Sequence, residues 1–198
     1  MNTRRCEWCA EHLGARHSHR ARFCSTRCRV AAHRAAKNDA TPRELTTRDR
    51  WVRRSADKRP LTVAGMAASS TDPRTWSTHK DAAASTAGVG LGFVLDGDGI
   101  VCLDLDHCLN PLTGQLAPWA AAIIRDAGAT YVEVSPSGDG LHIWGRAHVR
   151  QGRRIRRPDG TAVEIYGTGR YIAVTGQRFS GAPSTLADIS ALTADLTA

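Results

Sequence analysis

The sequence predicts an α+β (α/β) domain of ordinary size, preceded by a small metal-binding module. The chain has 198 residues, which is long enough for one such domain and a short module. Its first 30 residues hold two close pairs of cysteines, and later in the chain short apolar runs typical of strands alternate with segments of helical periodicity. With 41% hydrophobic residues, the larger part has enough apolar side chains to form a core.

The predicted module is defined by its cysteines. Cys6 and Cys9 are followed, after fourteen residues, by Cys24 and Cys28. Two close pairs joined by a short basic loop have the spacing of a tetrahedral zinc site, and metal binding supplies the folding free energy that so short a segment lacks. The sequence therefore predicts a structural Zn²⁺ held by four thiolates within residues 1–37. Alternatives for one of the thiolates are His12, His17, His19 and His33.

The second cysteine pair opens a predicted helix over residues 25–37 that carries basic side chains such as Arg29 and His33 on one face. The segment from Arg22 to Arg29 resembles the FCS-type treble-clef zinc fingers. That resemblance implies contact with nucleic acid or protein.

Charge is divided unevenly along the chain, whose net charge is +8. Residues 1–60 contain sixteen Lys and Arg against six Asp and Glu, and residues 61–198 contain eleven against thirteen. A basic arm joined to a nearly neutral body indicates a polyanionic partner, most simply nucleic acid; the alternative is a solvated basic tail. Since no run approaches a membrane span and no apolar signal region opens the chain, we expect a cytoplasmic protein with no membrane partner.

We expect a linker and a basic helix (45–56) over residues 38–57, and the main domain over residues 58–198. Lys58-Arg59-Pro60 is expected to close that helix, because proline does not continue one. The later elements are predicted in this order: a helix at 78–84, a strand at 88–95, a tight hairpin turn at 96–99, a strand at 101–106, a helix at 117–127, strands at 131–134, 141–144, 161–166 and 170–174, and a helix at 184–196.

Asp104 and Asp106 are the most informative residues of the body. They alternate with apolar residues in a predicted strand, so both carboxylates point to one face. Two like charges this close repel, and a divalent cation between them removes the repulsion. The pair therefore indicates a metal site; the alternative is an acidic pair at a loop edge without metal.

A serine-glycine turn later in the body suggests a binding site for an anion. Residues 135–140 include Ser137, Gly138 and Gly140, and such a turn offers backbone N–H groups to an anion. His142, in the next strand, is placed to add a donor to the same anion, unless it is structural.

Two further groups of charged residues follow. Glu164 alternates with Val163 and Ile165 in a predicted strand; it fits a third metal ligand, or the exposed side of a half-buried strand.

Arginine forks match phosphate oxygens, so an arginine-rich connection favours contact with a nucleic-acid backbone, although a solvated loop is the alternative. Its arginines that we expect to contact nucleic acid are Arg150, Arg153, Arg154, Arg156 and Arg157.

Taken in order, Asp104-Leu105-Asp106, the 137–142 segment ending in His142, and Glu164 resemble the motifs of the archaeo-eukaryotic primase superfamily, in particular the bifunctional primase–polymerase (prim-pol) domains of phages and plasmids. The resemblance covers about residues 50–178. It implies a two-part fold whose catalytic half is RRM-like, with a mixed or antiparallel sheet. Two departures are Gly140, where many relatives have serine or threonine, and Glu164 in place of aspartate.

The resemblance also implies roles for these residues. Asp104, Asp106 and Glu164 would hold two Mg²⁺ or Mn²⁺ ions, and His142 with Ser137 and the turn amides would hold the phosphates of an incoming nucleotide. Weaker candidates for the phosphate role are Arg170 and Lys58.

The function expected from this resemblance is template-dependent DNA priming or polymerisation, with a single-stranded DNA template and nucleoside triphosphates as partners. The setting would be phage or plasmid replication in a bacterial host cell, with any replicative helicase encoded separately. One alternative is a non-catalytic, zinc-dependent nucleic-acid-binding accessory protein of replication. Another is a sugar-nucleotide transferase, because Asp-x-Asp also holds a metal–diphosphate in those enzymes.

Overall fold

A computed structural model describes residues 4–7, 9, 11–14, 16–30, 41–156 and 161–198. The chain divides into two compact units, Met1–Ala40 and Thr41–Ala198. The second unit begins at Thr41, well before residue 58, where the sequence suggested the main domain would start.

The first unit is built around its cysteines. An isolated bridge pairs Arg5 with His12, and the Leu13 amide donates to the Arg4 carbonyl (2.9 Å). Residues 26–30 are helical, in agreement with the start of the predicted 25–37 helix; the rest of that prediction lies outside the described residues. Among the described residues of this unit, the buried apolar side chains are Cys6 and Leu13, which form a very small core.

The second unit is an α+β fold in which every pairing between its named strands is antiparallel, as predicted. Its elements are α2 (Arg43–Thr46), β1 (Trp51–Arg54), β2 (Pro60–Leu61), the 3₁₀ turn η1 (Pro73–Thr75), α3 (His79–Ala84), β3 (Gly90–Asp96), β4 (Ile100–Leu105), α4 (Pro118–Ala127), β5 (Val132–Val134), β6 (Leu141–Arg146), β7 (Arg153–Arg156), β8 (Ala162–Tyr166), β9 (Thr168–Val174) and α5 (Ser190–Thr197).

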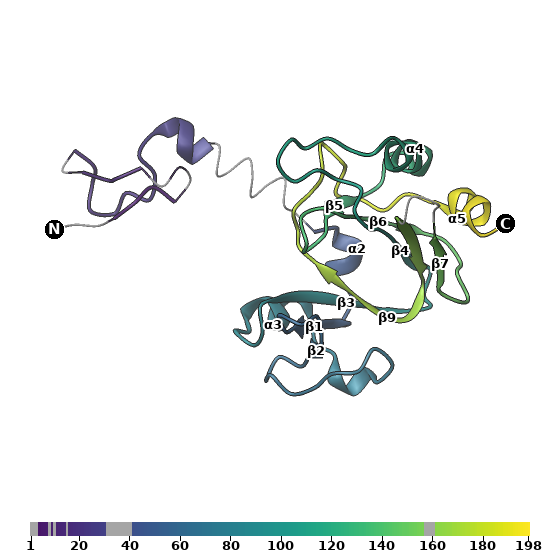
Figure 1. Ribbon diagram of the computed structural model, residues 1–198. Helices are drawn as coiled ribbons and strands as arrows, with labels where there is room; N and C mark the ends of the chain where they lie inside the picture. Colours follow the sequence, from purple (N-terminus) through teal and green to yellow (C-terminus); the bar gives the residue numbers. More distant parts are fainter. Residues whose placement is uncertain (1–3, 8, 10, 15, 31–40, 157–160) are drawn as a thin grey trace. The chain divides into compact units, whose positions relative to one another are not determined.

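These strands form two sheets (Figure 1). A four-stranded sheet has the order β2-β1-β3-β9, and a five-stranded sheet has the order β5-β6-β4-β8-β7. Helices α4 and α5 cover the face of the five-stranded sheet that is turned away from the other sheet. Apolar residues that alternate along its strands make this contact, among them Leu103, Ile143 and Ile165, which join Ile123 of α4 and Leu192 of α5 in one core.

The opposite face of the five-stranded sheet packs partly on the four-stranded sheet. Cys102 and Trp144 belong to a second core with Phe93 and Ile172 of the four-stranded sheet. The rings of Phe93 and Trp144 meet edge to face, with centroids 5.9 Å apart. Beyond this core the same face of the five-stranded sheet carries polar residues.

The predicted hairpin at residues 96–99 is wrong, although the tight turn is present. Gly97 and Gly99 have φ of 91° and 89°, which favours glycine. However, β3 and β4 on either side belong to different sheets, so the segment is a corner between sheets. Buried Arg50 forms ion pairs with Asp96 and Asp98 and thereby fixes the corner.

The predicted basic helix over residues 45–56 is also wrong. Helix α2 ends at Thr46, and the segment continues into β1, which pairs with β3. Trp51 and Val52 are fully buried there, and the Trp51 indole donates to the Leu45 carbonyl (3.1 Å). Burial of these β-favouring side chains outweighs the helical preference of the neighbouring arginines.

The Lys58-Arg59-Pro60 segment leads from β1 into β2 and does not end a helix. The Ser55 amide donates to the Arg59 carbonyl (2.9 Å), which closes the turn between the two strands. Pro60 lies in β2 at the edge of the four-stranded sheet, where its missing N–H disturbs no ladder.

Helix α5 and the arginine-rich connection also differ from the prediction. Helix α5 begins at Ser190 and not at residue 184. Just before it, Asp188 accepts a hydrogen bond from the Ser190 amide (2.8 Å). Part of the arginine-rich connection forms the edge strand β7 and pairs with β8.

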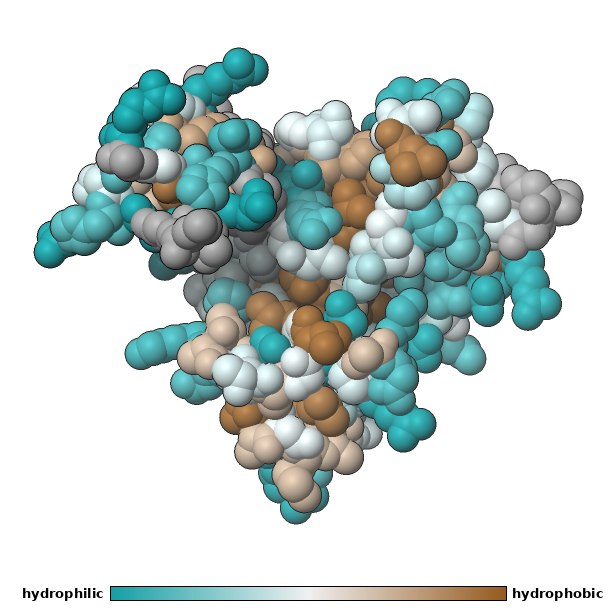
Figure 2. Space-filling model, turned by 60° about the vertical axis from the view of Figure 1, so that its left-hand side comes forward, coloured by the Kyte–Doolittle hydropathy of each residue, from teal (hydrophilic) through white to brown (hydrophobic). Residues whose placement is uncertain are grey.

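Exposed apolar surface is limited among the described residues. Figure 2 shows apolar residues on one face as separate patches among polar ones, and patches of this kind need no partner. The large apolar side chains that remain exposed are Val30, Val63, Met66, Val89 and Leu112. Within the described part of the chain, no helix is long and apolar enough to cross a membrane.

The placement of Trp51 in the core gives a stability test. We expect Trp51→Ala to lower the free energy of unfolding by about 3–5 kcal/mol, because it leaves a large cavity in the core. Chemical denaturation of the full chain measures this. Met66→Ala, at a side chain that is 69% exposed, serves as the control and should change stability by about 0.5 kcal/mol or less. An equally small effect of Trp51→Ala would contradict the assignment of β1.

Candidate active site

The register of the five-stranded sheet places five polar residues in one row, one from each strand. Asp104 of β4 lies opposite His142 of β6 on one side and opposite Glu164 of β8 on the other. Glu133 of β5 pairs with His142, and Arg154 of β7 pairs with Glu164. Since paired residues on antiparallel strands point to the same face, all five side chains project on the side away from α4 and α5.

This row borders a cleft of about 620 Å³ in the second unit. Strand β9 of the four-stranded sheet and the serine-glycine turn form its other walls. The residues that line the cleft are Lys58, Pro60, Ser70, Asp104, Asp106, Ser135, Pro136, Ser137, His142, Arg154, Glu164, Tyr166, Gly169, Arg170, Tyr171, Ile172 and Ala173. The three acidic residues and the histidine singled out from the sequence therefore share one cleft.

Asp104 lies at the centre of the row, and its environment disfavours its charge. Burial raises the pKa of Asp104, the His142 imidazole lowers it, and the carboxylates of Asp106 and Glu164 raise it again, with a net rise above the ordinary value. His142 Nε2 is 3.6 Å from Asp104 Oδ1. A cation placed near Asp104 would relieve this unfavourable burial of negative charge.

Both carboxylate oxygens of Glu164 have partners within the protein. Arg154 Nε donates to Oε1 (3.0 Å), and the Tyr166 hydroxyl donates to Oε2 (2.6 Å). Burial and the hydrogen bond to Glu164 raise the pKa of Tyr166 to about 12, so its hydroxyl remains a donor at neutral pH. Glu164 is thus half-buried and held in one orientation by two partners, unlike an ordinary exposed residue.

The three carboxylates are near one another but do not converge on a single point. Among the described residues, only the four cysteines of the first unit form a group of three or more metal-ligating side chains with ligand atoms all within 4.8 Å of one another. Asp104, Asp106 and Glu164 repel each other, and Arg154 and Tyr166 engage Glu164. A divalent cation bound by all three carboxylates would have to bring their oxygens closer together.

Glu133 is a site residue that the sequence analysis missed. It is fully buried, and His142 beside it is 3% exposed. His142 Nδ1 lies 3.1 Å from Glu133 Oε1. Burial by itself lowers the pKa of His142, but the hydrogen bond and charge of Glu133 and the charge of Asp104 raise it above the ordinary value. The signal in the sequence that could have revealed Glu133 was a carboxylate between two valines, in a strand that lies next to the strand of His142.

The serine-glycine turn contributes Ser135, Pro136 and Ser137 to the cleft. Ser137 is exposed and lies beside Ser135, with hydroxyls 2.9 Å apart. The Gly138 amide closes the turn by donating to the Ser135 carbonyl (3.0 Å). Gly138 and Gly140 do not line the cleft, so they shape the turn. A Cβ on Gly140 would lie 2.8 Å from the Leu105 carbonyl oxygen, which explains why a serine does not fit here.

Lys58 and Arg170 flank the cleft from the four-stranded sheet. Lys58 has φ of 60°, and the Tyr171 hydroxyl donates to its carbonyl. This contact holds the left-handed backbone in place. The Arg170 guanidinium stacks over the Tyr166 ring at 4.7 Å. The structure records no ion pair between either of these basic side chains and the carboxylates of the cleft.

The arginine-rich connection is divided by strand β7. Arg154 faces the cleft, whereas Arg153 donates from the opposite face to the Thr197 carbonyl (2.9 Å). Arg150 and Arg156 are exposed. Arg157 lies outside the described residues.

Comparison with known proteins identifies the family. A model of the family described as bifunctional DNA primase/polymerase, N-terminal, matches residues 28–194. The chain belongs to this family. It is also 39% identical over 123 residues to the DNA primase-polymerase of Nitratiruptor phage NrS-1. That match covers 59% of this chain and 17% of the phage protein, so the chain spans only a small part of the length of that relative.

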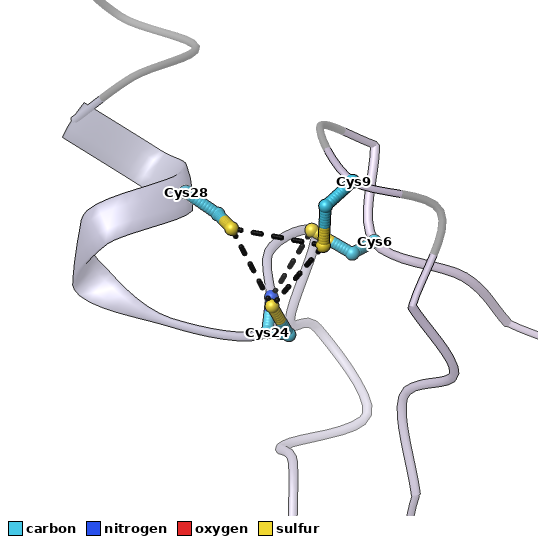
Figure 3. A group of neighbouring side chains, drawn as sticks. All are labelled: Cys6, Cys9, Cys24 and Cys28. Atoms are coloured by element: carbon cyan, nitrogen blue, oxygen red, sulfur yellow. Dashed lines mark hydrogen bonds between the residues drawn. The ribbon is translucent and has the colours of Figure 1, made fainter.

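Three of the four cysteines lie before the part that matches the bifunctional primase/polymerase family. Figure 3 shows the four side chains pointing toward one another, with Cys28 on the helix and Cys6 and Cys9 on a loop. Cys24 Sγ is 3.5 Å from the sulfurs of Cys9 and Cys28. A tetrahedral site with metal–sulfur bonds of about 2.3 Å separates its sulfurs by about 3.8 Å, so the cluster fits a metal ion.

The surroundings of the cluster agree with this assignment. The Cys24 amide donates to Cys6 Sγ (3.4 Å). Hydrogen bonds to Cys28 and Cys9 raise the pKa of Cys24 to about 12, so a metal ion must displace its proton. His17 is not a ligand, because its Nε2 lies 3.1 Å from the Cys24 carbonyl oxygen and its Nδ1 lies 3.3 Å from that of Gly14.

The cysteine cluster predicts one tightly bound metal ion per chain. We expect Cys24→Ser to lose that ion, as measured by elemental analysis of the purified protein, and to make residues 1–40 sensitive to protease. Cys108→Ser is the matched control: Cys108 is buried in the second unit, and its substitution should leave the metal content unchanged. Retention of the ion by Cys24→Ser would rule out the four-thiolate site.

Proposed function

We propose that this chain is a template-dependent DNA primase/polymerase that transfers nucleotides on single-stranded DNA by a two-metal mechanism. The observation that carries the proposal is the placement of Asp104 between His142 and Glu164 in one cleft, in a chain that belongs to the bifunctional primase/polymerase family. The phage relative is named for the same activity.

The donor set fits hard divalent cations. Asp104, Asp106 and Glu164 offer only carboxylate oxygens, which are the ligands that Mg²⁺ and Mn²⁺ prefer. The raised pKa of Asp104 agrees with this proposal, because burial and the neighbouring carboxylates of Asp106 and Glu164 disfavour its charge, and a divalent cation would offset both effects. Two ions held there would activate a primer 3′-hydroxyl and neutralise charge on the triphosphate.

The remaining cleft residues would bind the nucleoside triphosphate. His142 directs Nε2 toward Asp104, where a phosphate oxygen would lie between the imidazole and the ions. Ser137, Lys58 and Arg170 line the same cleft and would add donors to the phosphates. Arginine and lysine stabilise the charge that develops on phosphoryl oxygens during transfer.

Template contact is assigned to the basic surfaces. Arg150 and Arg156 are exposed, Arg156 lies on the same strand as Arg154, and the first sixty residues carry a large excess of positive charge. Such charge binds phosphate backbones without reading sequence. We assign a structural Zn²⁺ to the four cysteines. We also propose that the protein works in phage or plasmid replication in a bacterial host cell, with a separately encoded helicase as a partner.

Arg154 provides a test of the metal site that does not depend on activity. Its ion pair with Glu164 competes with a cation for the same oxygen. Since a partly exposed ion pair is worth about 0.2–1 kcal/mol, we expect Arg154→Ala to strengthen Mn²⁺ binding by up to about fivefold. Isothermal titration of the zinc-loaded protein without nucleotide measures this. Arg156→Ala, two residues along the same strand, is the control, and equal or weaker binding by Arg154→Ala would count against Glu164 as a ligand.

The activity test uses the aspartate pair. We expect Asp104→Asn with Asp106→Asn to lower incorporation of labelled nucleotide on a primed single-stranded template, with Mn²⁺, by at least about a hundredfold. Asp126→Asn, at an exposed position of α4, should retain wild-type incorporation.

Full incorporation by the double variant would contradict the proposed mechanism. A wild-type protein that binds single-stranded DNA but incorporates no nucleotide would instead favour the non-catalytic accessory protein.

A further inference from the structure

Glu133 is a fully buried carboxylate that none of the proposed steps uses. It lies on β5 at the end of the polar row, next to His142 of β6, and β6 separates it from the strand of Asp104. A buried carboxylate is expensive unless donors surround it, so its partners indicate why it is there.

The two oxygens of Glu133 have different partners. Oε2 accepts hydrogen bonds from the Tyr131 hydroxyl (3.1 Å) and from the amides of Thr175 (3.1 Å) and Gly176 (2.9 Å). These two amides follow β9, so Oε2 joins the four-stranded sheet to β5. Oε1 accepts from the Trp144 indole (3.2 Å) and lies 3.1 Å from His142 Nδ1.

The contact at Oε1 determines the orientation of the imidazole. A carboxylate in this position only accepts, so Nδ1 of His142 must carry a proton, whether or not Nε2 carries another. The ring then lies between Glu133 and Asp104, with Nε2 3.6 Å from Asp104 Oδ1. Glu133 is fully buried and His142 is 3% exposed, so the contact between them is shielded from solvent.

We propose that Glu133 is a positioning residue that fixes the ring of His142, so that Nε2 faces the bound nucleotide. This inference rests on the proposed function, in which His142 contacts the triphosphate. Glu133 itself does not line the cleft and touches no substrate. The competing explanation is that Glu133 only holds the two sheets together through Thr175 and Gly176.

A double-mutant cycle separates the two explanations. Glu133→Gln keeps a carbonyl for the Thr175 and Gly176 amides and removes the carboxylate beside His142. We expect it to raise the dissociation constant for a nucleoside triphosphate with Mn²⁺ about tenfold, as substitution of a residue that orients a ligand does. In a His142→Ala background the same change should have no further effect. Losses that add in the double variant, or no loss in the single one, would overturn the proposal.

Tyr131→Phe is the matched control. It removes one donor to Glu133 Oε2 and leaves the contact to His142. It should lower the melting temperature of the full chain, and nucleotide affinity should stay within about twofold of wild type. An affinity loss equal to that of Glu133→Gln would show that general loosening of the sheets explains both.

A second measurement needs no variant. Long-range proton–nitrogen NMR correlations of the wild-type protein should show a proton on Nδ1 of His142, and a bare Nδ1 would overturn the proposal even if the variants fail to fold. A wild-type protein that binds no nucleotide would contradict the proposed function, whereas an additive cycle in a protein that binds nucleotide would contradict only the role of Glu133.

Discussion

Asp104 pairs with His142 on one neighbouring strand and with Glu164 on the other, and the cleft depends on this register. Side chains alternate between the two faces of a strand, so a slip of β4 by one residue would turn Asp104 toward the apolar core under α4 and α5. The register is held by that core, because Leu103 and Leu105 on either side of Asp104 are fully buried. Packing on one face of the sheet therefore positions the polar residues on the other.

Charge along the row explains why the centre of the cleft suits a cation. The row begins with Glu133 beside His142 and ends with Glu164 beside Arg154. At both ends a carboxylate has a nitrogen partner. In the middle, Asp104 faces Glu164, with Asp106 close by, and like charges on paired strands destabilise each other. Burial and these neighbouring carboxylates together raise the pKa of Asp104.

The residues predicted from the sequence were those with a local signal. Asp104 and Asp106 were found because alternation in an apolar run fixes their face, and the four cysteines because their spacing suits a metal. The helix expected over 45–56 was wrong because the burial of Trp51 against β3 depends on distant residues. The same reason explains the corner at 96–99, which Arg50 holds through Asp96 and Asp98; no local pattern reveals that β3 and β4 enter different sheets.

Glu133 and the position of Arg154 in the cleft depend on strand order. The sequence shows a glutamate between valines and an arginine in a basic run, and neither pattern states which strand lies beside it. Only the order β5-β6-β4-β8-β7 brings both into the row with Asp104. Interactions of this kind follow from the topology of the whole domain, and the resemblance to the primase superfamily did not include them.

The most direct measurement of the central claim is a crystal structure of the protein soaked in Mn²⁺, with anomalous diffraction to locate the ions. The account predicts an anomalous peak bridging the carboxylates of Asp104 and Glu164, at metal–oxygen distances of about 2.1–2.2 Å, with the Arg154 side chain displaced from Glu164. Anomalous peaks only elsewhere on the protein, with the Arg154–Glu164 ion pair intact, would contradict it.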